Sequence, residues 1–428
     1  MTMSLQPVAH RPLNFHHAVL SALALLSLVY LVPKGFATYD PDGFGLDFRT
    51  IWLAGKVWAA GQNPYGPGFT QQYLEIFGPG WGFYYWFYPP NWFPVALLLS
   101  FFPFHVAVLA WSVLNFTLLV AATFLIARAL ADVSGQKCSQ LFLAGLTYVC
   151  FMQATAITVY IGQTSILIYF GFSAIIFGIL KERPAILIVG LVFVALKPQI
   201  GVVAIAAVAA LRRHRWTLLP TAAIGLVSIA PIIVGGDFRA TTEGFFSSLT
   251  RYNLAGSNSP GDLTGLINIL DYLSSSSIHP FIMTVISGLA AIIPGFAAVH
   301  FSSLNHPPQS DNARDQVASL ALLIAVTFFI VSLHPYDHVT LTAILMMILA
   351  FRFSGHWLIV LGLLICIRPS NLNGILGFSH PASQAFRESL LMSAGLFLIL
   401  MGALRAVLSS RSRSGAVSAI ANSERTVL

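Results

Sequence analysis

Long apolar runs separated by short polar segments dominate this chain from end to end. Few of the runs show the alternation of a barrel strand, and most reach or approach the roughly 20 residues that a helix needs to cross a bilayer. The pattern therefore predicts an all-α, polytopic transmembrane helical bundle of about 10 to 12 spans. The runs cover residues 17–36, 91–103, 105–131, 140–160, 163–180, 185–210, 216–235, 280–301, 317–333, 339–352, 356–367 and 387–408.

Three basic clusters set the expected orientation of these spans. They lie at 181–183, 212–215 and 405–413 and should face the cytoplasm, where Lys and Arg are enriched. The apolar run 185–210 between the first two clusters is too short for two full spans, which need about 40 residues. It must therefore enter the membrane and return. Proline disfavours helix in the residue before it, so a break is expected at Lys197, which then lies inside the protein.

The polar connections follow from this orientation. Residues 37–90, 236–279 and 368–386 fall on the non-cytoplasmic side, and 302–316 form a cytoplasmic loop. The first outer segment is rich in Trp, Tyr and Phe, whose rings favour the headgroup level. Short interfacial helices that lie along the membrane are therefore expected there.

The whole of residues 1–408 is predicted to be one membrane domain, followed by a disordered, serine-rich cytoplasmic tail at 409–428. One conflict in the topology remains. If 91–103 and 105–131 both cross the membrane, the basic residues Arg128 and Lys137 fall outside. Either one of these two runs is re-entrant, or the charge rule fails there.

Composition supports an integral membrane protein. Of the 428 residues, 57% are hydrophobic and 9% are charged, against about 45–50% and about 25% in soluble domains. The net charge of +7 resides in the clusters between spans, so no nucleic-acid partner is expected. Cys138, Cys150 and Cys366 have neither disulfide nor metal spacing. No small-residue cleavage site follows the first apolar run, which is expected to be a retained helix.

A carboxylate stands among tryptophans just after the first run, in GLDFRTIWLAGKVWAAGQNPY, residues 45–65. Asp47 begins a predicted short helix and has two compatible roles: N-cap of that helix, or general base of a transfer reaction at the outer face. Transfer of a sugar from a lipid phosphate to a hydroxyl also needs cations near the departing phosphate. Lys197, Arg368 and histidines are the candidates.

A second polar cluster interrupts the later spans, in VSLHPYDHVTL, residues 331–341. The topology places it on the side of the first outer segment, and ionisable residues at such depth usually face a bundle interior or a cavity. Two interpretations stay open. Asp337 either orients a histidine or caps the next helix, or the cluster forms part of a site. Its candidate side chains are His334, Tyr336, Asp337 and His338.

An anionic partner is expected for Lys197, because an ammonium near mid-bilayer costs roughly 2.5–3.5 kcal/mol on insertion scales. The partner is either a carboxylate of the protein, Asp47 or Asp337, or a lipid phosphate, with the phosphate slightly favoured. The polar break YIGQTS, residues 160–165, is either a plain loop or a source of hydrogen bonds from Gln163.

Five short motifs occur in the order found in the family 87 glycosyltransferases, and over roughly residues 40–350 the chain resembles that family. The motifs are DFRTIWLAGKVWAAGQNPY from Asp47, FYPP at 87–90, GQTS at 162–165, LKPQ at 196–199 and SLHPYD at 332–337.

The resemblance implies a GT-C type membrane enzyme. Such an enzyme transfers a hexose, typically mannose, from a polyprenyl-phosphate sugar to a lipid or glycan hydroxyl at the extracytoplasmic face of the cell membrane. No further cofactor is implied, and no metal. By the same resemblance Asp47 acts on the acceptor hydroxyl, and His334 and His338 lie at the active site. The side chains expected to bind substrate are Tyr65, Gln163, Lys197, Gln199, Tyr336, Asp337 and Arg368.

Two other classes share some of these features. Broken helices and intramembrane charges also occur in transporters and lipid flippases, which inverted repeats and charges at the midplane would mark. A ligase that joins preassembled lipid-linked glycans would present similar cations and histidines, so only its product separates it from a glycosyltransferase.

Overall fold

The computed structural model of the chain describes residues 15–40, 42–79, 84–209, 214–234, 237–254, 258, 262–274, 313–376 and 384–426. Within these ranges the regular structure is helical, and the only strand-like pairing is an isolated bridge between Thr264 and Leu333. The helices, in which η1 and η5 are of the 3-10 type, are α1 (Phe15–Gly35), α2 (Phe48–Ala59), α3 (Gly68–Phe77), η1 (Pro90–Trp92), α4 (Phe93–Ser100), α5 (Phe104–Ser134), α6 (Cys138–Phe151), α7 (Gln153–Ile161), α8 (Ser165–Leu180), α9 (Pro184–Val194), α10 (Pro198–Val208), α11 (His214–Val234), α12 (Phe238–Leu254), α13 (Leu266–Ser274), α15 (Ala313–Ile330), η5 (Pro335–Thr340), α16 (Leu341–Ala350), α17 (His356–Ile367), α18 (Pro369–Leu376) and α19 (Gln384–Thr426).

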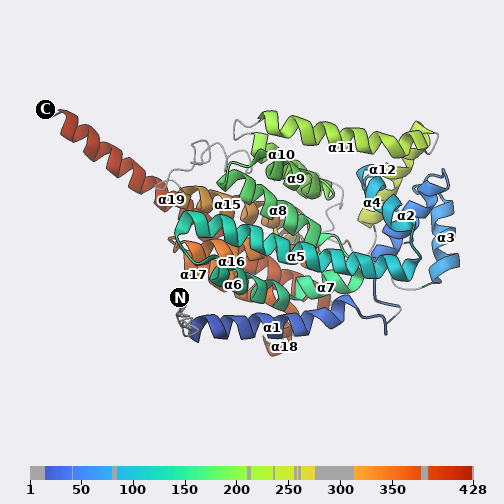
Figure 1. Cartoon of the computed structure of the whole chain (residues 1–428), viewed down its shortest axis with the longest axis horizontal. Helices are drawn as coiled ribbons and strands as arrows, with labels where there is room; N and C mark the ends of the chain where they lie inside the picture. The colour runs from blue at the N-terminus through green and yellow to red at the C-terminus, as the bar shows by residue number, and fades with distance from the viewer. Residues whose placement is uncertain are drawn as a thin grey trace, which may run out of the picture.

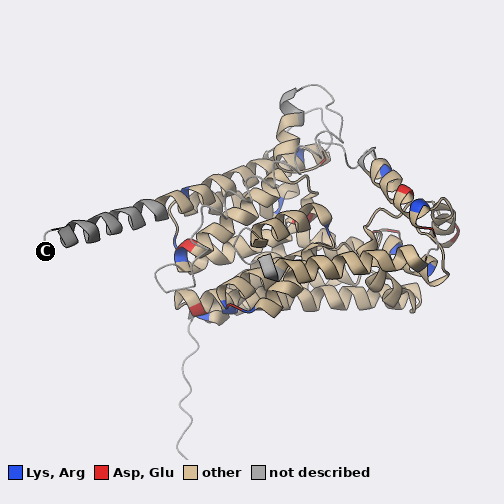
Figure 2. Ribbon diagram, turned by 90° about the horizontal axis from the view of Figure 1, so that it is seen from above, with Lys and Arg blue, Asp and Glu red and all other residues tan. Residues whose placement is uncertain are grey.

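Four of the described helices, α1, α5, α15 and α19, are long and apolar enough to cross a membrane. Three bent pairs raise the number to as many as seven: α6 with α7, α11 with α12, and α17 with α18. Charged residues are sparse along this bundle (Figure 2). The fold class is confirmed as an all-α, polytopic membrane protein.

The number of full spans among the described residues is lower than the predicted 10 to 12. Several apolar runs form helices of 10 to 17 residues, namely α8, α9, α10 and η5 with α16, which is fewer than the roughly 20 residues of a full crossing. The predicted span 280–301, most of the loop 302–316 and the basic pair 212–213 lie outside the described residues.

The long helices pack side by side, and the helices of the first outer segment gather at one end of them (Figure 1). Helix α5 has 31 residues and is about 46 Å long, well beyond the roughly 30 Å of a hydrocarbon core. Its N-terminal part carries α2, since the rings of Phe48 and Trp111 stack at 5.5 Å and Trp52 packs against Phe104 at 5.6 Å. The long α5 therefore anchors the segment that contains Asp47.

Aromatic residues of the first outer segment form a second core, separate from that of the bundle. Trp52, Trp58 and Trp86 are buried, and Trp58 meets Trp86 edge to face at 5.6 Å. Short helices were predicted in this segment, and α2 and α3 confirm them. These three rings pack inside the protein, and their expected place at the headgroup level stays a prediction. Rings close together in sequence pack against one another and remove more apolar surface from water than separate rings could.

The conflict over α4 and α5 is resolved by the length of α4, which has eight residues and cannot cross a membrane. Helix α5 is then a crossing whose C-terminal end meets the turn between α8 and α9, because Asp132 pairs with Lys181 at 2.7 Å. Arg128 pairs with the same carboxylate at 3.4 Å. The run 91–103 is the one that does not span, and Arg128 lies at the same end of the bundle as Lys181.

The C-terminal tail differs from its prediction. Helix α19 continues to Thr426, whereas residues 409–428 were expected to be disordered. The segment 409–426 contains a single glycine and no proline, so nothing in its backbone chemistry stops the helix that precedes it.

Gly162 joins α7 to α8 with φ +74°, and a Cβ at this position would lie 2.7 Å from the Cβ of Phe48. We expect Gly162→Ala to destabilise the protein by more than the 1 to 2 kcal/mol that a left-handed backbone costs an alanine. Gly135 is the matched control, since its φ is +72° and nothing lies within 4 Å of its Cβ position. Thermal unfolding in detergent measures both, and equal shifts would show that the contact with Phe48 is unimportant.

Candidate active site

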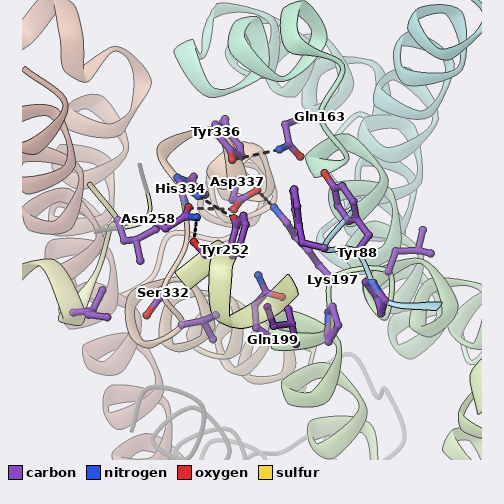
Figure 3. A pocket seen from close by; sticks show the side chains of 18 of the residues that line it. Tyr88, Gln163, Lys197, Gln199, Tyr252, Asn258, Ser332, His334, Tyr336 and Asp337 are labelled. Atoms are coloured by element: carbon purple, nitrogen blue, oxygen red, sulfur yellow. Dashed lines mark hydrogen bonds and ion pairs between the residues drawn. The ribbon is translucent and has the colours of Figure 1, made fainter. Parts of the chain in front are cut away.

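A cavity of about 410 Å³ lies where the first outer segment, the α9–α10 break, α12 and the segment before η5 converge (Figure 3). Part of the lining is apolar, with Leu196, Leu249 and Ile267 among its residues. The rest consists of polar side chains from elements far apart in the sequence. The labelled ones include Gln163, Lys197, Tyr252, His334 and Asp337.

An ion pair between Lys197 and Asp337 lies among the polar lining residues. The ammonium donates to Oδ1 of Asp337, and the Ser165 hydroxyl donates to the same oxygen at 2.7 Å. Both charged side chains are buried. Of the partners predicted for Lys197, a protein carboxylate or a lipid phosphate, the structure shows the carboxylate of Asp337, because the segments that carry the two residues meet at the cavity.

Asp337 also caps η5. Its Oδ2 accepts a hydrogen bond from the backbone N–H of His334 at 3.2 Å. The interpretation of the VSLHPYDHVTL cluster as a local network held by Asp337 is therefore confirmed. That network faces a cavity, and its role in a functional site stays a prediction. Since each carboxylate oxygen has a partner, Asp337 fixes the position of Lys197 and the start of η5 together.

His334 lines the cavity with its ring stacked on that of Tyr336, at a centroid distance of 4.9 Å. Its Nε2 lies 3.2 Å from the hydroxyl of Tyr252 on α12. Burial lowers the pKa of His334 to about 4, so the imidazole is neutral at physiological pH. It can exchange hydrogen bonds with a ligand but does not supply a cation.

Asp47 is connected to the cavity through Gln163. The amide nitrogen of Gln163, which lines the cavity, donates to Oδ2 of Asp47 at 2.6 Å and to the Tyr336 hydroxyl at 3.3 Å. Backbone pairing sets this arrangement, since the N–H of Asp47 donates to the carbonyl of Ile161 at 2.8 Å. Burial raises the pKa of Asp47 to about 6. The N-cap hypothesis is wrong for the side chain, because it makes no cap hydrogen bond to α2.

The α9–α10 break is held by the segment that returns from the first outer loop. At this break Lys197 has an extended backbone, with φ −115° and ψ 94°. Asn91 donates its side-chain amide to the carbonyl of Ala195 at 3.1 Å, and the indole N–H of Trp92 donates to the carbonyl of Leu196 at 3.0 Å. These two bonds satisfy carbonyls that a helix end leaves free. They therefore fix the backbone of Leu196, the residue before Lys197.

Asn91→Ala is expected to lower the free energy of unfolding by about 1 to 3 kcal/mol, the cost of a buried carbonyl left without its donor. The transfer rate of the variant should fall by more than the loss of folded protein explains, because the α9–α10 break that carries Lys197 is no longer held in one position. Thermal unfolding and activity of the same detergent preparation measure the two effects. Trp92→Phe removes the neighbouring bond and should act in the same direction; if neither variant changes stability, the break does not depend on this segment.

Four of the predicted site residues do not line the cavity. Asp47 lies one hydrogen bond away from it, at the Gln163 amide. His338 is fully buried behind it, with Nε2 2.6 Å from the Thr264 hydroxyl. Tyr65 lies behind Tyr88 and donates its hydroxyl to that residue's carbonyl at 2.7 Å. Arg368 lies elsewhere, with its guanidinium 4.5 Å from the ring centroid of Tyr30. Lys197, Gln199, Gln163, His334, Tyr336 and Asp337 do line it.

The lining residues that were not among the predicted ones include Tyr88, Tyr252 and Asn258. Tyr88 stands in the FYPP motif, so the sequence contained a signal for it. Tyr252 and Asn258 follow α11 in a polar segment without any motif, and only the folded position of α12 brings them to His334.

Among the residues that the structure describes, no group of three or more His, Cys, Asp or Glu side chains could hold a metal ion. The sequence model of glycosyltransferase family 87 matches residues 86–351, well over half of the 428-residue chain. The matched range contains Lys197, His334 and Asp337 but begins after Asp47. No curated protein matches the chain significantly.

Proposed function

The chain belongs to glycosyltransferase family 87, and from this we propose that it transfers a hexose, mannose being the first to test, from a polyprenyl-phosphate sugar. The acceptor is a hydroxyl of a lipid or glycan. The observation that carries the proposal is the single cavity in which the ammonium of Lys197, the imidazole of His334 and the amide of Gln163 converge.

The charge of the cavity supports a phosphodiester as the donor. Lys197 supplies the only cation among the described lining residues. An ammonium has three hydrogens, and Asp337 engages one of them, which leaves donors for one phosphate. A polyprenyl-phosphate sugar carries one negative charge, whereas a diphosphate would need more positive charge than Lys197 alone supplies.

In the proposed step the acceptor oxygen forms a bond to the anomeric carbon while the bond from that carbon to the phosphate oxygen breaks, with inversion. The electron pair of the broken bond leaves with the polyprenyl phosphate, which Lys197 stabilises. The acceptor proton passes to Asp47. The pKa of Asp47, raised by burial to about 6, suits a base that works near neutral pH, because it is ionised there and still binds a proton well.

The basic clusters support an extracytoplasmic cavity in the cell membrane. Helix α8 begins beside the cavity, where Ser165 bonds Asp337, and ends at Lys181. Its 16 residues separate the two by about 24 Å. Since basic residues mark the cytoplasmic side, the Lys181 turn faces the cytoplasm and the cavity faces outward. A cavity near one face also suits an enzyme better than a transporter, whose site lies near the midplane.

Purified protein in proteoliposomes tests this proposal. With a polyprenyl-phosphate hexose labelled in the sugar and a membrane lipid extract as acceptor, we expect label to move to a new lipid and free polyprenyl phosphate to appear in equal amount. Movement of the intact donor across the bilayer without a new product would identify a flippase. Transfer of a preassembled oligosaccharide in place of a single sugar would identify a ligase.

A further inference from the structure

Three stacked aromatic rings form one wall of the cavity. The ring of Phe87 lies between those of Tyr88 and Tyr252, at centroid distances of 4.6 and 4.4 Å and with interplanar angles of 26° in both pairs. All three residues line the cavity, and Figure 3 labels the two tyrosines. The wall joins the first outer segment to α12.

Several contacts within the protein hold Tyr88 in place. Its ring also packs against Trp86 at 5.1 Å and Trp92 at 5.2 Å. Its carbonyl accepts the hydroxyl of Tyr65 at 2.7 Å. The ring and backbone of Tyr88 are therefore fixed, and its hydroxyl is left to face the cavity.

This buried hydroxyl has no hydrogen-bond partner among the described residues. The amide of Gln163 lies near it, but the amide hydrogens of Gln163 are directed to Asp47 and Tyr336. A buried hydroxyl without a partner costs about 1 to 3 kcal/mol. A bound ligand that supplies the missing partner recovers this cost.

Asn258 presents a second such atom on the lining. Its side-chain nitrogen donates to the carbonyl of Tyr252, which orients the amide and identifies the free atom as Oδ1. That oxygen is buried and has no partner among the residues that the structure describes. The cavity thus offers one hydroxyl, which can donate or accept, and one carbonyl, which can only accept.

Electrostatics favour a neutral ligand group beside Tyr88. Burial first, and then the carboxylate of Asp47, raises the pKa of Tyr88 well above its usual value, so the hydroxyl stays protonated. The same carboxylate repels an anion there. The cation that would attract a phosphate, Lys197, is at the ion pair with Asp337.

We propose that the Tyr88 hydroxyl and Asn258 Oδ1 bind hydroxyl groups of the transferred hexose and thereby set the sugar specificity. The inference rests on the proposed function and adds to it the position of the sugar, against the aromatic wall, with the phosphate at Lys197.

Tyr88→Phe removes one oxygen and keeps the ring packing, so it tests the contact with little risk to the fold. We expect kcat/KM for the intact donor to fall about tenfold, the effect of losing one net hydrogen bond in a buried site. Each monodeoxy donor is then compared in both proteins. The one whose missing hydroxyl Tyr88 binds should be about tenfold worse for the wild type and no worse than the intact donor for the variant.

The matched control is Tyr169→Phe, which also removes a buried hydroxyl, one that lies 3.1 Å from the hydroxyl of Thr123, away from the cavity lining. It should discriminate between donors as the wild type does. Asn258→Ala should relax discrimination at a different hydroxyl of the sugar. If Tyr88→Phe retains the full wild-type discrimination against every monodeoxy donor, the inference is overturned.

Binding separates failure of this inference from failure of the proposed function. Tryptophan fluorescence can follow binding of the same polyprenyl-phosphate hexose, because Trp86 and Trp92 pack against Tyr88. If the wild type binds it about tenfold more tightly than Tyr88→Phe but transfers no sugar, the sugar contact stands and the transfer proposal fails. Equal affinities would overturn the contact whatever the transfer assay shows.

Discussion

Lys197→Met is expected to abolish transfer and to lower the free energy of unfolding by about 3 to 5 kcal/mol. The reason is that the variant leaves the carboxylate of Asp337 buried without its counter-ion, which costs more than the ion pair contributes. Asp337 is 2% exposed, so water cannot replace the ammonium without opening the cavity. Thermal unfolding in detergent and sugar transfer in proteoliposomes measure the two losses.

A double variant separates stability from chemistry. In Lys197→Met with Asp337→Asn both charges are gone, and the introduced amide can still accept from the backbone N–H of His334 and donate to the Ser165 hydroxyl, the two groups that the carboxylate contacts. We expect stability to return to within about 1 kcal/mol of the wild type, as for other buried ion pairs replaced on both sides. Transfer should stay at background, because no cation remains beside the phosphate. A double variant that is both stable and active would show that Lys197 is structural.

Lys181→Met is the control for these effects. Its ammonium pairs with Asp132 at 2.7 Å at the far end of α8, where both side chains are partly exposed. Solvent-exposed pairs contribute about 0 to 1 kcal/mol. Stability should therefore change little and transfer should not change.

Asp47→Asn is expected to reduce the transfer rate by about 10² to 10⁴, the usual contribution of a general base. Asparagine keeps the size of the side chain and can still meet the Gln163 amide, but it cannot take a proton. The wild-type rate should rise with pH through about 6, following the pKa of Asp47, and then level off. In the variant this rise should be absent. Initial transfer rates between pH 5 and 8 measure both.

The stability of Asp47→Asn should move in the opposite direction from its activity. Because burial raises the pKa of Asp47 from 3.8 to about 6, the folded state binds the proton more tightly than the unfolded state. The carboxylate therefore destabilises the fold progressively as pH rises from about 4 to about 6, and by a constant amount above that. At pH 7.5 the variant should be at least as stable as the wild type. Asp42→Asn, at an exposed carboxylate of the same segment, should leave activity unchanged.

The sequence predicted the features that depend on local chemistry. The break before Pro198, the short helix after Asp47 and the all-α membrane class each follow from proline, periodicity and composition. The role of Asn91 did not follow, since its partner, the carbonyl of Ala195, is 104 residues away. A contact of that kind depends on how the helices pack.

The candidate site was predicted as a set of residues but not as an arrangement. Asp337 and Lys197 were both recognised, yet their pairing depended on α9, α10 and η5 meeting. Arg368 was misplaced for the same reason: a basic residue after a span looks like a phosphate ligand in sequence, while in the fold its side chain lies over Tyr30. The contribution of α12 to the cavity could not be predicted. Tyr252 contacts His334 only because α12 is bent by 110° relative to α11.

The central claim is that the donor's phosphate binds in the cavity at the ammonium of Lys197. The most direct measurement is a structure of the protein in lipid nanodiscs with a polyprenyl-phosphate hexose bound. The account predicts a phosphate oxygen within hydrogen-bond distance of the Lys197 ammonium and the sugar against the rings of Tyr88 and Tyr252. A donor bound with its phosphate at Arg368, or anywhere outside this cavity, would contradict it.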